Sequence, residues 1–270
     1  MYPGGKSKLK KEILEKIQLI TNNNISEYRE PFVGAGSIFK TLIDKKLVNN
    51  IWINDKDIGI YCYWLAVKDY PQELQKAVKK IIPSVEYFKK IKRELLGVKE
   101  VPTEKREIVN IALKTLVLHQ TSHSGLGKMG GAKGGNIQNT KIDSRWNPNK
   151  EIIDIRKFNT EFKKIQVKIT CLDFAFLLDR RRKKNVFIYL DPPYVEKGHL
   201  LYSNSFNNNY HKDLRFLLKR SPHKWLLSLD DNEFVRDLYH WADIEETKVE
   251  YSIKGHKHAK ELFITKKMEE

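Results

Sequence analysis

The sequence is poor in cysteine, in long apolar runs and, relative to its basic residues, in acidic ones. Cys62 and Cys171 are the only cysteines among 270 residues, which excludes a disulfide-stapled scaffold and a four-cysteine zinc site and is typical of a reducing compartment. No run approaches the roughly 18 apolar residues of a membrane-spanning helix, and the lysine-rich N-terminus lacks the apolar core of a signal peptide. We therefore expect a cytoplasmic protein with no membrane partner.

The shortage of acids leaves a large positive charge. There are 34 Asp and Glu against 50 Lys and Arg, a formal net charge of +16, which predicts a polyanionic partner, most simply nucleic acid. The apolar fraction of 40%, with 12 Phe, 12 Tyr and 5 Trp, is sufficient for a packed core and excludes global disorder. The length fits one large α/β domain, or a core domain with a smaller insert.

Short apolar runs typical of strands alternate with segments of helical periodicity. The expected strands are residues 28–32, 51–53, 167–172, 186–190, 225–229, 247–253 and 261–265. The expected helices are residues 6–20, 37–47, 208–220 and 232–241, together with a mostly helical region over 57–122 that breaks at Pro71, Pro83 and 97–102. This alternation predicts a mostly parallel sheet with helices on both faces.

Residues 121–150 differ in composition from the rest of the chain. They hold 6 of the 14 glycines, and five Lys or Arg against one acid, Asp143. Such a composition predicts a mobile, basic surface insert and not a core element.

The strongest chemical signal is Asp191-Pro192-Pro193-Tyr194, which directly follows the apolar run 186–190. Ligands of open parallel sheets collect at the carboxyl ends of strands, where this tetrapeptide must lie. Two successive prolines stiffen the turn and leave carbonyl acceptors beside the Asp191 carboxylate, and Tyr194 offers an aromatic face. The arrangement suits a planar base with an exocyclic amine; the plainer alternative is a rigid turn with a packed tyrosine.

A second signal, residues 30–37 (EPFVGAGS), lies at an expected strand-to-helix turn. Gly34 and Gly36 let the backbone approach a ligand closely, and the following helix offers unpaired N–H groups. Asp55, 19 residues after Gly36, is spaced to accept hydrogen bonds from a ribose. Because the third glycine of a dinucleotide motif is missing, a single nucleoside is favoured.

Gly4-Gly5-Lys6-Ser7 looks like the end of a phosphate-binding loop, but the first glycine of that motif would have to precede Met1. An ATPase is therefore disfavoured, and Lys6 needs another role.

These residues together resemble one family. The segments that carry the resemblance are Tyr2-Pro3-Gly4-Gly5-Lys6, residues 30–37, Asp55, Asp173-Phe174 and Asp191–Tyr194. They occur in the order and spacing of the Dam-like, class alpha DNA adenine-N6 methyltransferases, over about residues 1–60 and 165–265. Because only Met1 precedes Tyr2, the sequence leaves open a truncated or misassigned start.

The resemblance implies a Rossmann-like methyltransferase domain that binds S-adenosylmethionine, formed by residues 1–70 and 160–270. It also implies a mainly helical insert, 71–159, with a target-recognition region near 119–150. The residues it implies for the cofactor are Tyr2, Lys6, Phe32, Gly34, Gly36, Ser37, Asp55, Asp173, Phe174 and Asp191. Asp191, Pro192, Pro193 and Tyr194 would carry catalysis on an adenine flipped out of double-stranded DNA.

Candidate DNA contacts lie mainly in the basic insert, although its Trp146 has the alternative role of anchoring the insert to the core. They are His123, Ser124, Lys128, Lys133, Arg145, Trp146, Asn147, Tyr202 and Asn204. The basic run 180–184 precedes the strand that carries Asp191, so we expect it at the opposite edge of the sheet. His119, His123 and the pair His256 and His258 are interpreted as surface or nucleic-acid contacts, and no metal is expected.

Three alternatives to a DNA adenine methyltransferase stay open at this point. The acceptor-rich turn would also serve an RNA methyltransferase or one acting on the cytosine N4 amine, and a non-catalytic nucleic-acid-binding protein could keep the same fold. We expect a monomer or weak dimer, with a cognate restriction endonuclease as a candidate partner.

Overall fold

A computed structural model describes residues 9–134, 141–178, 184–194, 208–250 and 258–267. The chain divides into two compact units. The described part of the first, the helical unit, is Gly34–Gly36 with 54–134 and 141–172. That of the second, the sheet unit, is 9–33, Ser37–Ile53 and the described residues from Asp173 onward.

The helical unit is built from amphipathic helices and one short strand. Its elements are α3 (Ile58–Asp69), α4 (Pro71–Lys79), α5 (Val85–Gly97), α6 (Lys105–Thr121), η1 (His123–Gly125), η2 (Gly127–Met129), α7 (Pro148–Phe162) and β3 (Gln166–Thr170). Local signals set the boundaries: Asp57, Ser84 and Asn147 cap α3, α5 and α7 through side-chain oxygens. Pro71 opens α4, where a proline is tolerated.

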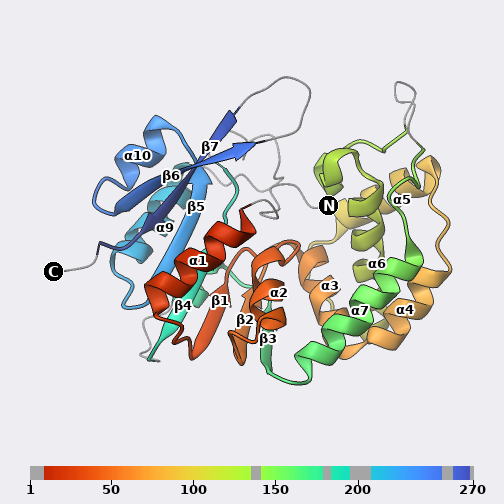
Figure 1. Cartoon of the computed structure of the whole chain (residues 1–270). Coiled ribbons are helices and arrows are strands. Elements are labelled where there is room, and N and C mark those ends of the chain that lie inside the picture. The colour runs from red at the N-terminus through yellow and green to blue at the C-terminus, as the bar shows by residue number, and fades with distance from the viewer. Residues whose placement is uncertain (1–8, 135–140, 179–183, 195–207, 251–257, 268–270) are drawn as a thin grey trace. The chain divides into compact units, whose positions relative to one another are not determined.

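The sheet unit contains the parallel sheet that the sequence predicts (Figure 1). Its elements are α1 (Lys10–Thr21), β1 (Glu27–Glu30), α2 (Ser37–Asp44), β2 (Asn50–Asn54), η3 (Phe174–Leu178), β4 (Val186–Leu190), α9 (Asn208–Lys219), β5 (Lys224–Asp230), α10 (Glu233–Leu238), β6 (Asp243–Glu250) and β7 (His258–Thr265). Its strands follow the order β2-β1-β4-β5-β7-β6. The pairs from β2 to β5 are parallel, and β7 is antiparallel to both of its neighbours.

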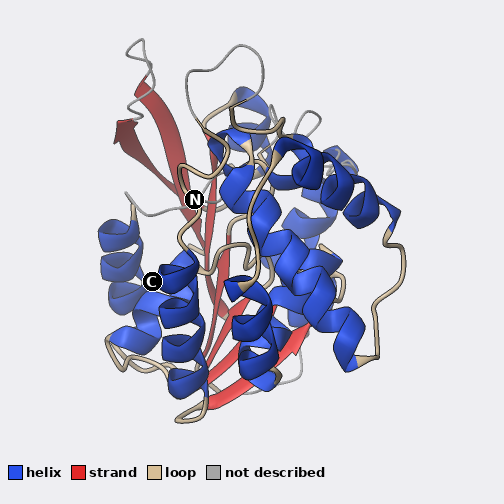
Figure 2. Ribbon diagram, turned by 90° about the vertical axis from the view of Figure 1, so that its right-hand side faces the viewer, coloured by secondary structure: helices blue, strands red, loops and turns tan. Residues whose placement is uncertain are grey.

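Helices cover both faces of this sheet, which appears as one twisted layer of strands in Figure 2. On one face, buried side chains of α9 and α10 pack against the strands through Leu214, Leu218, Val235, Ile188, Leu227 and Ile264. On the other, α1 and α2 bury Ile13, Ile17, Phe39 and Leu42. The predicted α/β class, mostly parallel with helices on both faces, is confirmed.

The structure corrects two expectations about local structure. The strand expected near 247–253 is present but begins earlier, at Asp243, and β6 pairs with β7 from Asp243 to Glu250. Residues 121–130 were expected at the surface, yet Ser122, Gly125 and Gly127 are buried. Positive φ angles of 51°, 74° and 58° at Ser124, Gly125 and Gly127 fold this segment back on the end of α6.

Candidate active site

Asp191-Pro192-Pro193-Tyr194 follows β4 in the parallel part of the sheet. All five residues of β4 are buried, because β4 lies between β1 and β5 and helices cover both faces of the sheet. Pro192 is buried, whereas Asp191, Pro193 and Tyr194 are partly exposed. The tetrapeptide therefore stands at a carboxyl edge, where open α/β sheets bind ligands.

Tyr194 is held at its far end by a buried carboxylate. Its hydroxyl donates a hydrogen bond to Glu261 Oε2 at 3.2 Å. The hydroxyl of Ser228, in β5, donates to the other oxygen of Glu261. Glu261 lies in β7 opposite Asp230 and is only 3% exposed. The antiparallel strand β7 therefore supplies a carboxyl group that supports the turn after the parallel strand β4.

A second buried carboxyl group lies at the end of β1. Glu30 accepts hydrogen bonds from the Tyr28 hydroxyl at 2.8 Å and from the Phe39 backbone N–H at 3.2 Å. Burial raises the pKa of Glu30 to about 8, outweighing these bonds, and the negative charge of Asp191 raises it further. Glu30 is therefore mostly protonated at neutral pH.

His211 of α9 adds a neutral imidazole close to the two prolines. It is 1% exposed. Burial lowers the pKa of His211 to about 4, although the charge of Asp230 and a backbone hydrogen bond at Pro193 oppose the shift. A neutral ring in contact with Pro193 stiffens the turn without adding charge to it.

Asp173 and Phe174 lie beside an open hollow of about 440 Å³ in the sheet unit. The rings of Phe32 and Tyr210 have their centroids 5.7 and 6.3 Å from that of Phe174. The hollow is lined by Asp173, Phe174, Ala175, Tyr210, Asp213, Phe216 and Leu217. Aromatic walls with carboxylate acceptors are suited to a purine that carries an amine.

The glycine turn and Asp55 meet within the helical unit. The backbone N–H of Gly34 donates to Asp55 Oδ2 at 2.9 Å, and that of Asp57 donates to Oδ1 at 2.9 Å. Gly34 and Gly36 have φ angles of 45° and 67°, which favour glycine. Trp64 Nε1 holds the turn in place by donating a hydrogen bond to the Gly34 carbonyl at 3.0 Å.

The carboxyl group of Asp55 is partly buried, and the charges of Asp57 and Lys128 act on it. Burial raises the pKa of Asp55 to about 7, and the charge of Asp57 adds to the shift, while Lys128 opposes it. Lys128, from the glycine-rich insert, forms an ion pair with Asp57 Oδ2 at 2.7 Å. Lys128 thus partly neutralises the negative charge of Asp57.

Several residues predicted to contact DNA have partners within the helical unit. Trp146 Nε1 donates to the Ile81 carbonyl at 3.2 Å, the anchoring role noted above, and Asn147 Oδ1 accepts from the Lys150 N–H at 3.0 Å. The exposed His123 and Ser124 contact each other, at 3.2 Å between Nδ1 and Oγ.

Lys133 and Arg145 influence each other electrostatically. Desolvation, and after it the positive charge of Arg145, lower the pKa of Lys133. Both side chains are partly exposed. Lys and Arg side chains are the groups that neutralise the phosphates of nucleic acids.

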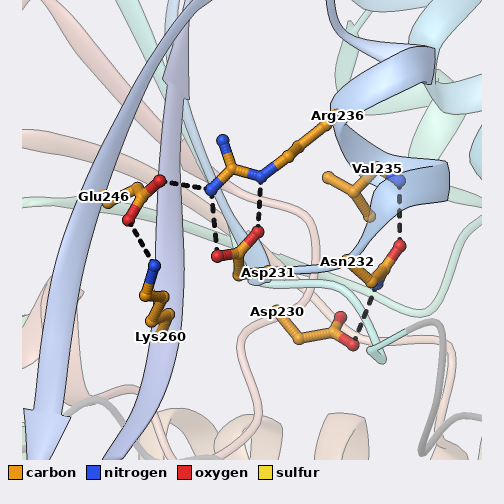
Figure 3. A network of polar contacts seen from close by, with 7 residues as sticks. All are labelled: Asp230, Asp231, Asn232, Val235, Arg236, Glu246 and Lys260. Carbon is orange, nitrogen blue, oxygen red and sulfur yellow. Dashed lines mark hydrogen bonds and ion pairs between the residues drawn. The ribbon is translucent and has the colours of Figure 1, made fainter.

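A polar network braces the end of β5 against α10, β6 and β7 (Figure 3). Arg236 donates to both carboxylate oxygens of Asp231, at 2.6 and 2.9 Å, and to Glu246 at 2.5 Å. Glu246 also accepts from Lys260 at 3.0 Å. Lys260 directly precedes Glu261 in β7, and successive side chains of a strand point to opposite faces. By holding Lys260 on one face, the network therefore also fixes the direction of Glu261 on the other.

Residues 2–253 match the family model described as D12 class N6 adenine-specific DNA methyltransferase. The chain belongs to this family. It is also similar to a curated protein named type II methyltransferase M.MjaIII, from Methanocaldococcus jannaschii, with 24% identity over 204 residues that cover 72% of this chain and 67% of the relative. The protein is therefore an adenine-specific DNA methyltransferase, and its sheet is the Rossmann-like sheet of these enzymes.

Some of the predicted site residues lie in parts of the chain that the structure does not describe. Tyr2, Lys6, Tyr202, Asn204, His256 and most of the basic run 180–184 lie outside the described residues. Within the described ranges, no group of three His, Cys, Asp or Glu is placed to hold a metal ion. None of the described helices is long and apolar enough to cross a membrane.

In each unit the structure places residues that the sequence did not mark, or marked wrongly, beside predicted site residues. Glu261, Ser228 and His211 are brought to the tetrapeptide by strand pairing and helix packing, and no local motif marks them. His119 was expected at the surface, but its Nδ1 lies 2.9 Å from the Gly125 carbonyl and its ring stands against Gly127.

Proposed function

We propose that the methyltransferase uses S-adenosylmethionine as methyl donor and acts on an adenine flipped out of double-stranded DNA onto Asp191–Tyr194. The observation that carries the proposal is the position of this tetrapeptide at the carboxyl end of β4, with the aromatic hollow beside Asp173 in the same unit. A base must leave the duplex, because its reactive edge is otherwise paired.

The described residues that would bind S-adenosylmethionine form two groups, one in each unit. In the helical unit, Asp55 would accept hydrogen bonds from ribose hydroxyls, and the backbone at Gly34 and Gly36 admits a close ligand. In the sheet unit, Asp173 would accept from the adenine amine of the donor, while Phe32 and Phe174 supply apolar contact. Ser37, the first residue of α2, offers an N–H at a helix N-terminus.

The tetrapeptide would prepare the target amine. When bound, S-adenosylmethionine supplies an electrophilic methyl group. The lone pair of an adenine N6 is delocalised into the ring, which makes the nitrogen a poor nucleophile. If its two N–H groups donate hydrogen bonds to Asp191 and to the Pro192 carbonyl, a pyramidal and more nucleophilic nitrogen is favoured. Tyr194 would stack on the base, and the preplaced acceptors would contribute through orientation and electrostatics.

DNA would be bound mainly by the insert 71–159. Lys133 and Arg145 are our first choice for phosphate contacts, because they repel each other in the free protein. Lys128 is engaged by Asp57, so we assign it first to the cofactor side and only second to DNA.

The test measures transfer of the tritium-labelled methyl group of S-adenosylmethionine to genomic DNA that is free of N6-methyladenine, followed by analysis of the nucleosides. We expect label in N6-methyladenine, and a loss of at least about a hundredfold in Asp191→Ala. Asp237→Ala, an exposed acid of α10, is the matched control and should keep the wild-type rate. Label found only in RNA or in N4-methylcytosine would overturn the proposal.

A further inference from the structure

Glu261 is a buried acid that the proposed reaction does not use. Its carboxylate is 3% exposed and lies at the start of the apolar run Leu262, Phe263 and Ile264. A carboxylate removed from water needs compensating donors, and the structure provides two hydroxyls, those of Tyr194 and Ser228.

The pairing of β5 with β7 explains why Glu261 points toward these hydroxyls. Asp230 is opposite Glu261 and Ser228 is opposite Phe263. Residues directly opposite share a face, as do residues two apart in one strand, so Ser228 and Glu261 lie on the same face. The adjacent Lys260 is tied to Glu246 on the other face (Figure 3), which resists a one-residue slip that would turn Glu261 away.

The contact between Glu261 and Tyr194 involves the hydroxyl end of the tyrosine and not its ring. The Tyr194 hydroxyl donates its hydrogen to Glu261 Oε2. Anchoring the ring at its oxygen fixes the direction in which the ring points.

We propose that Glu261 is a positioning residue that holds the Tyr194 ring ready to stack on the target adenine. This rests on the proposed role of Asp191–Tyr194 as the adenine site. Ser228 orients the carboxylate by occupying its second oxygen. The Tyr194 ring is therefore oriented before DNA binds, so less conformational entropy is lost in reaching the transition state.

The experiment is a double-mutant cycle on methyl transfer with Glu261→Gln, Tyr194→Phe and the double variant. Glutamine keeps the shape but replaces one acceptor with a donor, so one hydroxyl loses its partner. Phenylalanine keeps the ring and removes the bond. We expect each single change to lower kcat about 10- to 100-fold at saturating DNA, the range expected when a buried polar group loses its hydrogen-bond partner.

The decisive result is the double variant. If Glu261 acts through Tyr194, the double variant is no slower than the slower single variant, and the affinity for S-adenosylmethionine is unchanged in all three. Multiplication of the two losses would show that Glu261 acts elsewhere and would overturn the inference. An Asp191→Ala variant that keeps full activity would instead overturn the proposed function, so the two failures are distinguishable.

Controls separate positioning from folding. Glu233→Gln, an exposed acid of α10, should keep the wild-type kcat. Should Glu261→Gln fail to fold, the cycle is run with Ser228→Ala, which leaves the carboxylate in place but removes the hydrogen bond from Ser228 to one of its oxygens. We then expect a loss of several-fold in the wild-type background and none in Tyr194→Phe, while equal losses in both backgrounds would contradict the inference.

Discussion

Lys128 forms a 2.7 Å ion pair with Asp57, whose backbone N–H donates to the carboxylate of Asp55 at 2.9 Å. The glycine-rich insert is thereby connected to the acid that we assign to the cofactor ribose. Burial and the charge of Asp57 raise the pKa of Asp55 to about 7, and Lys128 counters this. The insert therefore contributes to keeping Asp55 ionised.

Replacing Lys128 with methionine should weaken binding of S-adenosylmethionine. Without the cation the pKa of Asp55 rises, so less carboxylate is ionised and available to accept ribose hydrogen bonds at neutral pH. We expect the Kd, measured by calorimetric titration at pH 7.5, to increase about 3- to 10-fold. Affinity should rise with pH in both proteins, with the midpoint at higher pH in the variant.

Lys114→Met is the matched control for this prediction. Lys114 forms a 2.9 Å ion pair with Glu94 in the same unit, and the two pairs have similar exposure. Its loss should leave the Kd unchanged. Equal weakening in both variants would mean that Lys128 acts only through general stability.

The geometry of Gly127 gives a prediction about the segment that carries Lys128. Its φ angle is +58°, and a Cβ there would lie 2.4 Å from Cε1 of His119. We expect Gly127→Ala to lower the free energy of unfolding by about 1–3 kcal/mol and to weaken cofactor binding, because Lys128 moves. Urea unfolding and titration measure the two effects.

Gly131 supplies the comparison, because a Cβ there would have nothing within 4 Å. Gly131→Ala should leave both quantities near their wild-type values. A Gly127→Ala protein as stable as this control would show that His119 can move aside at little cost.

The fold was largely predictable, because strands such as β4 and β5 are compact apolar runs. Val186–Leu190 is wholly buried and directly precedes Asp191, so one motif indicated both the strand and the edge of the sheet. Asp55 was likewise marked by its spacing from Gly36.

The support of the site was not predictable, because it depends on pairing between distant segments. Glu261 is 67 residues from Tyr194, and its direction follows from the register of an antiparallel strand between β5 and β6. The insert was misjudged for a related reason: its glycines signal flexibility, whereas their positive φ angles serve a tight turn against His119.

The buried Glu30 predicts how stability depends on pH. Its pKa is about 8 in the folded protein against 4.5 for the ordinary group, so the native state holds a proton that the unfolded chain releases between these values. Stability must therefore fall as pH rises from about 4.5 to 8. Between pH 6 and 9, urea unfolding should show wild type losing on the order of 2–3 kcal/mol more than Glu30→Gln.

Glu100→Gln, at an exposed position, should keep the wild-type pH slope. A Glu30→Gln protein with that same slope would mean that Glu30 is ionised in the folded state. Its negative charge would then lie close to Asp191 at neutral pH.

Lys133 and Arg145 predict the salt dependence of DNA binding. Each phosphate that a cation neutralises releases counterions, so the slope of log affinity against log salt changes by about one per contact. We expect Lys133→Ala with Arg145→Ala to reduce the slope by about two and to weaken binding at low salt. Fluorescence anisotropy with labelled duplex DNA measures both quantities.

The control for this prediction removes the same charge from another part of the helical unit. Lys89 and Lys90 are exposed on α5, and their double alanine variant lowers the net charge equally. If the interface is local, this variant keeps the wild-type slope, because counterions are released only where phosphates are contacted. An equal reduction in both variants would instead show that overall charge, and not the pair formed by Lys133 and Arg145, determines binding.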